Sequence, residues 1–141
     1  MRADEYLSRI DRLDARIFDL LTEKQRLMEM ATRLSPDMTG LPHAGGVSDR
    51  VGSAAVKLAS VDEEINRTVD RLIDARAEVT ALLEMLPDDE YRVLHQYYVQ
   101  QRVVGAIAEN WIPRGITERQ VFRIKARALR RVQAILDARE A

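Results

Sequence analysis

The chain has 141 residues, of which 32% are charged, with a formal net charge of −1 and no cysteine. This composition is compatible with one domain or two small ones, and it excludes disulfides, thiolate metal sites and a cysteine nucleophile. No apolar run approaches the roughly 20 residues that cross a bilayer, and the charged start lacks the apolar segment of a signal peptide, so we expect no membrane contact and a cytoplasmic location.

The first predicted element runs from about Asp4 to Leu34. Its apolar residues recur at intervals of four and three, the heptad spacing of a packed helix. The stripe comprises Tyr6, Ile10, Leu13, Ile17, Leu20, Leu27, Ala31 and Leu34, with Lys24 at one of its positions. No glycine or proline precedes Pro36, so the pattern predicts one helix of roughly 45 Å at 1.5 Å per residue.

The composition of residues 35–50 predicts a flexible loop. The segment contains two prolines and three glycines and few large apolar residues, a composition typical of a connector. Its paired glycines near a histidine are not a phosphate-binding loop, because the required Gly-x-x-x-x-Gly-Lys-Ser/Thr pattern is absent.

A second heptad helix is predicted from about Asp49 to Met85, with Gly52 weakening its first turn so that the stable part begins nearer Ala54. Its stripe comprises Leu58, Val61, Ile65, Thr68, Leu72, Ala75, Val79, Leu82 and Leu86, widened by Val69, Ile73 and Leu83. We therefore expect residues 1–86 to form a long antiparallel hairpin of coiled-coil type. The wider stripe indicates burial against more than one neighbour, so we also expect homo-oligomers through these helices.

Residues 87–141 predict a second domain of short helices. A helix is predicted to begin at Pro87 and the acids Asp88, Asp89 and Glu90. A second helix is predicted at Val103–Glu109, and residues 113–115 end the helical pattern. Thr117 and Gln120 have the spacing of a capping box that opens the last helix. The predicted core comprises Leu94, Tyr98, Val104, Ile107, Ala108, Trp111, Ile116, Val121, Ile124, Ala128 and Leu129. This is the pattern of a DNA-binding helix-turn-helix, and we expect an all-α fold throughout.

Charge is distributed asymmetrically along the chain. Residues 61–90 carry ten acids and three arginines, whereas residues 117–141 carry seven bases and three acids. Positive potential at one end favours a polyanionic partner there, and we expect that partner to be double-stranded DNA. Near the start of the last helix, the candidate base contacts are Arg119, Gln120 and Arg123, because arginine pairs with guanine and glutamine with adenine. The candidate phosphate contacts are Arg114, Thr117, Lys125, Arg127, Arg130 and Arg131.

The segment from Leu86 to Val132 resembles region 4 of the sigma-70-type RNA polymerase sigma factors. The matching residues are Leu86-Pro87, Tyr97-Tyr98, Ile107-Ala108-Glu109, Ile116-Thr117 and Arg127-Ala128-Leu129. They cover about a third of the chain. The turn at Trp111-Ile112-Pro113-Arg114-Gly115 is about three residues longer than the family pattern, which bears on the angle of the last helix. Nothing matches sigma region 2.

The whole chain is similar to small phage and prophage proteins of the ArpU/RinA-like type. The likeness lies in Gly45-Gly46-Val47-Ser48-Asp49-Arg50, a glycine-rich connector before a helix start, and in Arg119-Gln120-Val121-Phe122-Arg123-Ile124. The resemblance implies a phage-encoded transcription regulator that activates late genes, works through the host RNA polymerase and resides at the nucleoid of a bacterial host.

Two other readings remain open. A small terminase subunit also joins a helix-turn-helix to helical oligomerisation, although its DNA-binding part more often comes first. A helical interaction module would carry the basic helix merely as a solvated face. An enzyme is the weakest option, because the two histidines, His43 and His95, lie far apart and the carboxylates Asp62, Glu63 and Glu64 sit on a polar helical face. We therefore expect no catalytic residue, cofactor or metal.

Overall fold

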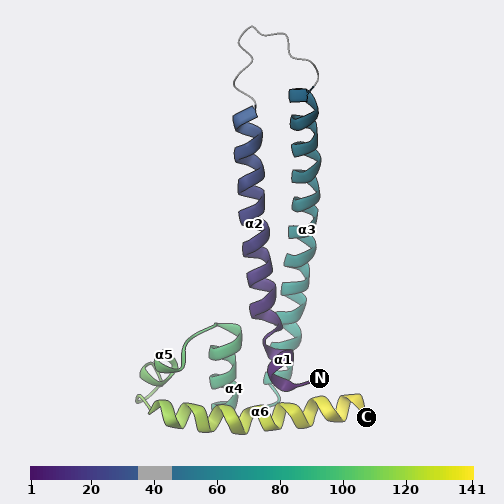
Figure 1. The fold of residues 1–141 in the computed structure, drawn as a ribbon. Coiled ribbons are helices and arrows are strands. Elements are labelled where there is room, and N and C mark those ends of the chain that lie inside the picture. The colour runs from purple at the N-terminus through teal and green to yellow at the C-terminus, as the bar shows by residue number, and fades with distance from the viewer. Residues whose placement is uncertain (35–45) are drawn as a thin grey trace. The chain divides into compact units, whose positions relative to one another are not determined.

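The computed structural model describes the backbone of residues 1–34 and 46–141, and the side chains of residues 1–33 and 52–141. Every described element is helical, so the predicted all-α class is confirmed (Figure 1). The elements are α1 (Ala3–Leu7), α2 (Arg9–Leu34), α3 (Gly46–Leu83), α4 (Asp88–Leu94), a π-helical turn η1 (His95–Val99), α5 (Val104–Glu109) and α6 (Glu118–Glu140). No described helix is both long enough and apolar enough to span a membrane.

The chain divides into two compact units. Unit 1 contains Met1–Arg12 and Leu72–Ala141, and unit 2 contains Leu13–Arg71. The ends of the expected hairpin, residues 1–12 and 72–86, therefore cluster with the C-terminal helices and not with the rest of the hairpin.

Unit 2 consists of the longer parts of α2 and α3. The heptad residues face inward: Leu20 and Leu27 of α2 are buried, as are Val61 and Thr68 of α3. Ion pairs join the two helices, with 2.5 Å between Arg16 Nη2 and Glu64 Oε1 and 2.8 Å between Lys24 Nζ and Asp62 Oδ1. Each such exposed pair contributes under about 1 kcal/mol, so apolar packing along the stripes supplies most of the stability.

The predicted single helix from Asp4 to Leu34 is interrupted at Ser8. This residue separates α1 from α2 and has ψ −5°, outside regular helical values. Nearby carbonyl groups accept bonds from arginine side chains: Arg12 Nη2 lies 3.0 Å from the oxygen of Glu5, and Arg9 Nε lies 3.1 Å from that of Tyr6. These local bonds satisfy backbone acceptors at the break, a detail that heptad spacing cannot show.

The second long helix begins earlier than expected. Residues 46–50, which were predicted as the end of the loop, belong to α3. The helix therefore begins before Asp49 and Ala54, the two starting points that we predicted. No proline occurs between residues 43 and 86, and a glycine costs a helix only about 1 kcal/mol. The remainder of the predicted loop, residues 35–45, lies outside the described residues.

The core of unit 1 joins α4, α5 and α6. Val93, Ile107, Ala108 and Val121 form its buried centre. Partly buried hydrophobic side chains pack around this centre: Tyr97, Val104, Trp111, Ile116 and Ile124. Most of the residues that we expected in the core of this domain therefore lie in or against it.

One carboxylate is buried between α4 and α6. The Glu90 side chain is only 1% exposed, and Arg131 Nε donates to both of its oxygens at 3.1 and 3.2 Å. Next to it, Arg127 Nη2 lies 2.5 Å from Asp89 Oδ2. A buried charge requires a partner of opposite sign, so this pair fixes how α6 lies along α4.

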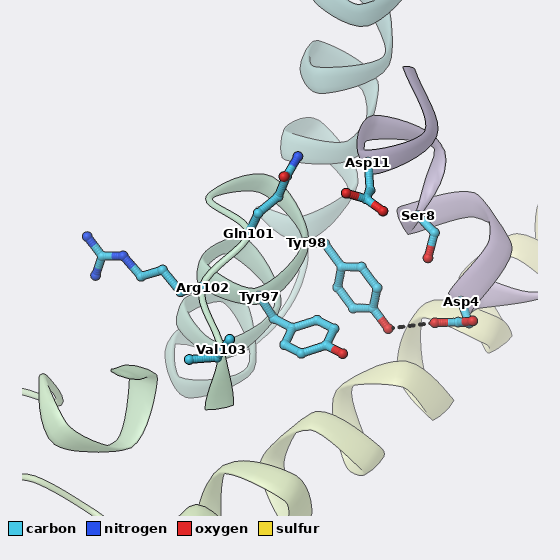
Figure 2. Close-up of a pocket in the computed structure, with 8 residues that line it drawn as sticks. All are labelled: Asp4, Ser8, Asp11, Tyr97, Tyr98, Gln101, Arg102 and Val103. Carbon is cyan, nitrogen blue, oxygen red and sulfur yellow. Dashed lines mark hydrogen bonds between the residues drawn. The ribbon is translucent and has the colours of Figure 1, made fainter. Parts of the chain in front are cut away.

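The start of the chain is attached to the same unit. The Ala3 amide donates to Gln133 Oε1 of α6 at 2.7 Å, and the Tyr98 hydroxyl of η1 donates to Asp4 Oδ1 at 2.9 Å (Figure 2). Burial, followed by this hydrogen bond, raises the pKa of Tyr98 well above its ordinary value of 10.0. The phenol therefore stays protonated and keeps donating across the physiological pH range.

We expect Arg131→Met to lower the free energy of unfolding by about 2–3 kcal/mol, because it leaves the buried Glu90 carboxylate without a hydrogen-bonded cation and with only Arg127, whose Nε lies 3.9 Å from Oε1, nearby. Chemical denaturation measures the loss. Arg130→Met is the matched control, since Arg130 is exposed and its loss should change stability by less than about 0.5 kcal/mol. The double variant Glu90→Met/Arg131→Met should recover most of the loss, and a double variant less stable than Arg131→Met would contradict this account.

A second prediction concerns His95 in η1, whose ring stacks on Tyr91 with centroids 5.2 Å apart. Burial, and secondarily the charge of Arg76, lower its pKa below the ordinary 6.5. As pH falls, His95 is protonated in the unfolded chain before it is protonated in the folded protein. The neutral, folded His95 therefore contributes its full stabilisation above pH 6.5, and this stabilisation is lost as the pH falls toward the folded pKa. His95→Phe, which retains an aromatic ring, should show a smaller loss of stability between about pH 7.5 and about pH 5. Identical pH profiles for the two proteins would be inconsistent with this assignment.

Candidate nucleic-acid interface

Helices α5 and α6 are joined by residues 110–117. The Ile116 amide donates to the carbonyl oxygen of Ala108 at 3.0 Å, which ties the end of this turn back to α5. Arg92 of α4 lies over the Trp111 ring at 3.9 Å and donates to the Ile112 carbonyl at 3.3 Å. The turn is therefore attached to both α4 and α5, and it sets where α6 begins.

The capping box at the start of α6 is confirmed. The backbone amide of Gln120 donates to Thr117 Oγ1 at 3.1 Å, and the backbone amide of Thr117 donates to the side-chain oxygen Oε1 of Gln120 at 2.9 Å. This bond occupies the oxygen that Gln120 would need for bidentate recognition of adenine. The sequence predicted both a capping role and a base contact for Gln120, and the structure confirms the capping role, which uses the same oxygen. The Thr117 hydroxyl proton remains available to donate to a phosphate.

Three of the expected phosphate contacts have partners within the molecule. Lys125 Nζ lies 3.9 Å from the centroid of the Tyr97 ring. Arg127 is paired with Asp89, and Arg131 with Glu90. We predicted these three cations as phosphate contacts, but because α4 lies against α6, acids of α4 pair with both arginines and a tyrosine ring of η1 lies against the lysine.

The remaining predicted arginines have no internal partner among the residues that the structure describes. Arg114, Arg119, Arg123 and Arg130 are exposed, and within the described residues none has a hydrogen-bond or ion-pair partner. Arg119, Arg123 and Arg130 lie at intervals of four and seven on α6, so they share one face of the helix. The opposite face, with Val121, Ala128, Val132 and Leu136, is buried.

The same exposed face carries two residues that sequence reasoning missed. Phe122 is 53% exposed and lies beside Arg119, three residues before it, and Ala126 follows one turn later and is also exposed. A signal was present in the sequence, because a buried stripe at residues 121, 124 and 128 places residue 122 outward. We call Arg119, Phe122, Arg123, Ala126 and Arg130 the outward face of α6.

A cavity of about 290 Å³ lies elsewhere in unit 1, between η1 and the start of the chain (Figure 2). Asp4 and Asp11 contribute carboxylates to its wall, Tyr97 and Tyr98 contribute rings, and Arg102 extends away from it in the view. Its two carboxylates outnumber the one arginine, so the lining is net negative and disfavours a phosphate. Among the residues that the structure describes, no group of three histidine, aspartate or glutamate side chains is arranged to hold a metal ion.

Comparison of the chain with protein-family models, with curated proteins and with solved structures gives no match. The function of the protein must therefore be inferred from the geometry and charge of α6 and from the sequence motifs.

The capping box yields a stability prediction. Thr117→Ala removes the acceptor for the Gln120 amide and should lower the free energy of unfolding by about 1 kcal/mol. Thr117→Ser retains a hydroxyl and should lose much less. Thermal or chemical unfolding followed by circular dichroism compares the three proteins. Equal stability of the alanine variant and the parent would show that the cap does not contribute.

Proposed function

We propose that the chain is a sequence-specific DNA-binding protein in which α5 and α6 form a helix-turn-helix. One observation carries the proposal: the exposed half of a capped helix displays arginines that have no partner within the described part of the chain, while its other half is buried in the core. In such folds the second helix lies in the major groove and contacts bases through its first turns. The outward face of α6 begins in its first turn, where Arg119 lies.

We assign Arg119 and Arg123 to base edges, because both are near the start of α6 and arginine donates two hydrogen bonds to guanine. Arg114, Thr117 and Arg130 are assigned to phosphates, which fix position without reading sequence. Gln120 reads a base only if the capping box opens. Lys125, Arg127 and Arg131 have internal partners, so they supply weaker, longer-range attraction to the backbone.

The resemblance to ArpU/RinA-like proteins and to sigma region 4 supports a narrower proposal. In it, the protein is a phage-encoded transcription regulator that activates late genes together with the host RNA polymerase, in the bacterial cytoplasm. Homo-oligomers are proposed to form through the N-terminal helices. Phe18 and Leu21 of α2, 70% and 49% exposed, support such an interface, because large apolar side chains grouped on a surface often mark one.

Selection of duplexes from random DNA, followed by titration of the selected duplex at several salt concentrations, tests the proposal. A DNA reader prefers the selected sequence and loses affinity steeply as salt rises. Failure to bind any duplex at low salt would instead favour a helical interaction module. Light scattering in solution distinguishes the alternative of a small terminase subunit. A terminase subunit should assemble into a ring, whereas a transcription regulator should form a dimer.

Two arginine variants should separate base from phosphate contacts. Arg123→Ala should weaken binding to the selected duplex by about 1–3 kcal/mol and weaken binding to random DNA much less. Arg130→Ala should weaken both to a similar extent and reduce the salt slope by about one. Arg71→Ala, in the exposed part of α3, is the control and should leave both affinities unchanged. Equal losses on both DNAs for Arg123→Ala would remove it from the base contacts.

A further inference from the structure

The outward face of α6 contains one large apolar side chain. Phe122 is 53% exposed, and it is not among the side chains that form or surround the buried centre of unit 1. Arg119, three residues before Phe122, is its neighbour on the helix surface, and both Arg119 and Arg123 on this face are exposed cations. A helix that merely faced solvent would gain nothing from a phenyl ring here, since exposing apolar surface to water is unfavourable.

The shape of the helix around Phe122 leaves the ring accessible. Ala126 lies four residues further on, directly beside Phe122 on the helix surface, and is itself exposed. A methyl side chain at this position allows another molecule to approach the ring closely. On the helix surface, Phe122 is therefore flanked by the cation Arg119 three residues before it and by the small residue Ala126 four residues after it.

The partner that suits this arrangement combines negative charge with a small apolar group. The major groove of DNA has both: phosphates line its edges, and the C5-methyl of thymine is the apolar group on its floor. An apolar protein surface is less suitable, because it would bury Arg119 and Arg123 without compensating their charge. We propose that Phe122 contacts thymine methyl groups and makes the protein select thymine in its site, an inference that rests on the proposed function.

Replacing thymine by deoxyuridine tests this directly, because it removes only the methyl group and keeps base pairing and charge. The probe is the duplex that the protein selects from random DNA, synthesised once with thymine and once with deoxyuridine throughout. The parent protein should bind the deoxyuridine duplex about fourfold more weakly for each methyl group contacted, the expected effect of one buried methyl. Phe122→Ala should bind both duplexes equally, with the affinity that the parent has for deoxyuridine.

Two further variants complete the design. Phe122→Leu keeps an apolar side chain and should retain part of the preference for thymine. Arg130→Ala should bind more weakly overall yet keep the full preference, because it removes a phosphate contact only. Circular dichroism checks that each variant remains helical, and the comparison of the two duplexes with the parent protein needs no variant at all.

The outcomes distinguish the two proposals. If the parent prefers its selected sequence, with a steep salt dependence, but binds thymine and deoxyuridine duplexes equally, the role of Phe122 is overturned and DNA binding stands. A preference for thymine that persists in Phe122→Ala overturns the role of Phe122 as well. If the parent binds no duplex at low salt, the proposed function fails and the inference fails with it.

Discussion

The buried carboxylate of Glu90 is the constraint on which the arrangement of unit 1 depends. A charge that is 1% exposed is stable only beside a cation, and Arg131 supplies that cation through two hydrogen bonds from one nitrogen. Replacing such a pair by apolar residues is often neutral, so its value here lies in geometry more than in strength. Arg131 faces α4 to satisfy Glu90, so this pair and the buried stripe of α6 together set the rotation of α6 about its axis and determine which residues face outward.

This rotation has a direct consequence for the charges. Two acids of α4 form ion pairs with Arg127 and Arg131 of α6, and a tyrosine ring of η1 packs against Lys125 of α6. The strongly basic composition of residues 117–141 therefore overstates the positive potential that a partner would meet. What remains is Arg119, Arg123 and Arg130 along one line of the helix, Arg139 in its last turn, and Arg114 in the turn before α6. A narrow row of cations is better suited to a groove than to a broad anionic surface.

Local patterns predicted much of the fold. Apolar spacing identified buried residues such as Ile10, Leu20 and Val79, because a heptad stripe must face a neighbour, and the Thr117–Gln120 spacing predicted the capping box. The break at Ser8 was missed, since the arginine bonds to Glu5 and Tyr6 carbonyls leave no periodic signal. The internal pairing of Lys125, Arg127 and Arg131 was also missed. It depends on contacts across about 30–40 residues of sequence, which no local pattern encodes.

The capping box also favours arginine over glutamine as the residue type that contacts bases. Opening the box to free Gln120 costs about 1 kcal/mol, while a good bidentate contact contributes about 1–3 kcal/mol of discrimination. The net gain from Gln120 is therefore small, and it would come with a loosened first turn of α6. Arg119 and Arg123 incur no such cost, because neither has an internal hydrogen bond to give up within the described residues. Recognition by this helix should accordingly depend on its arginines, with Gln120 holding the helix start in the position from which they act.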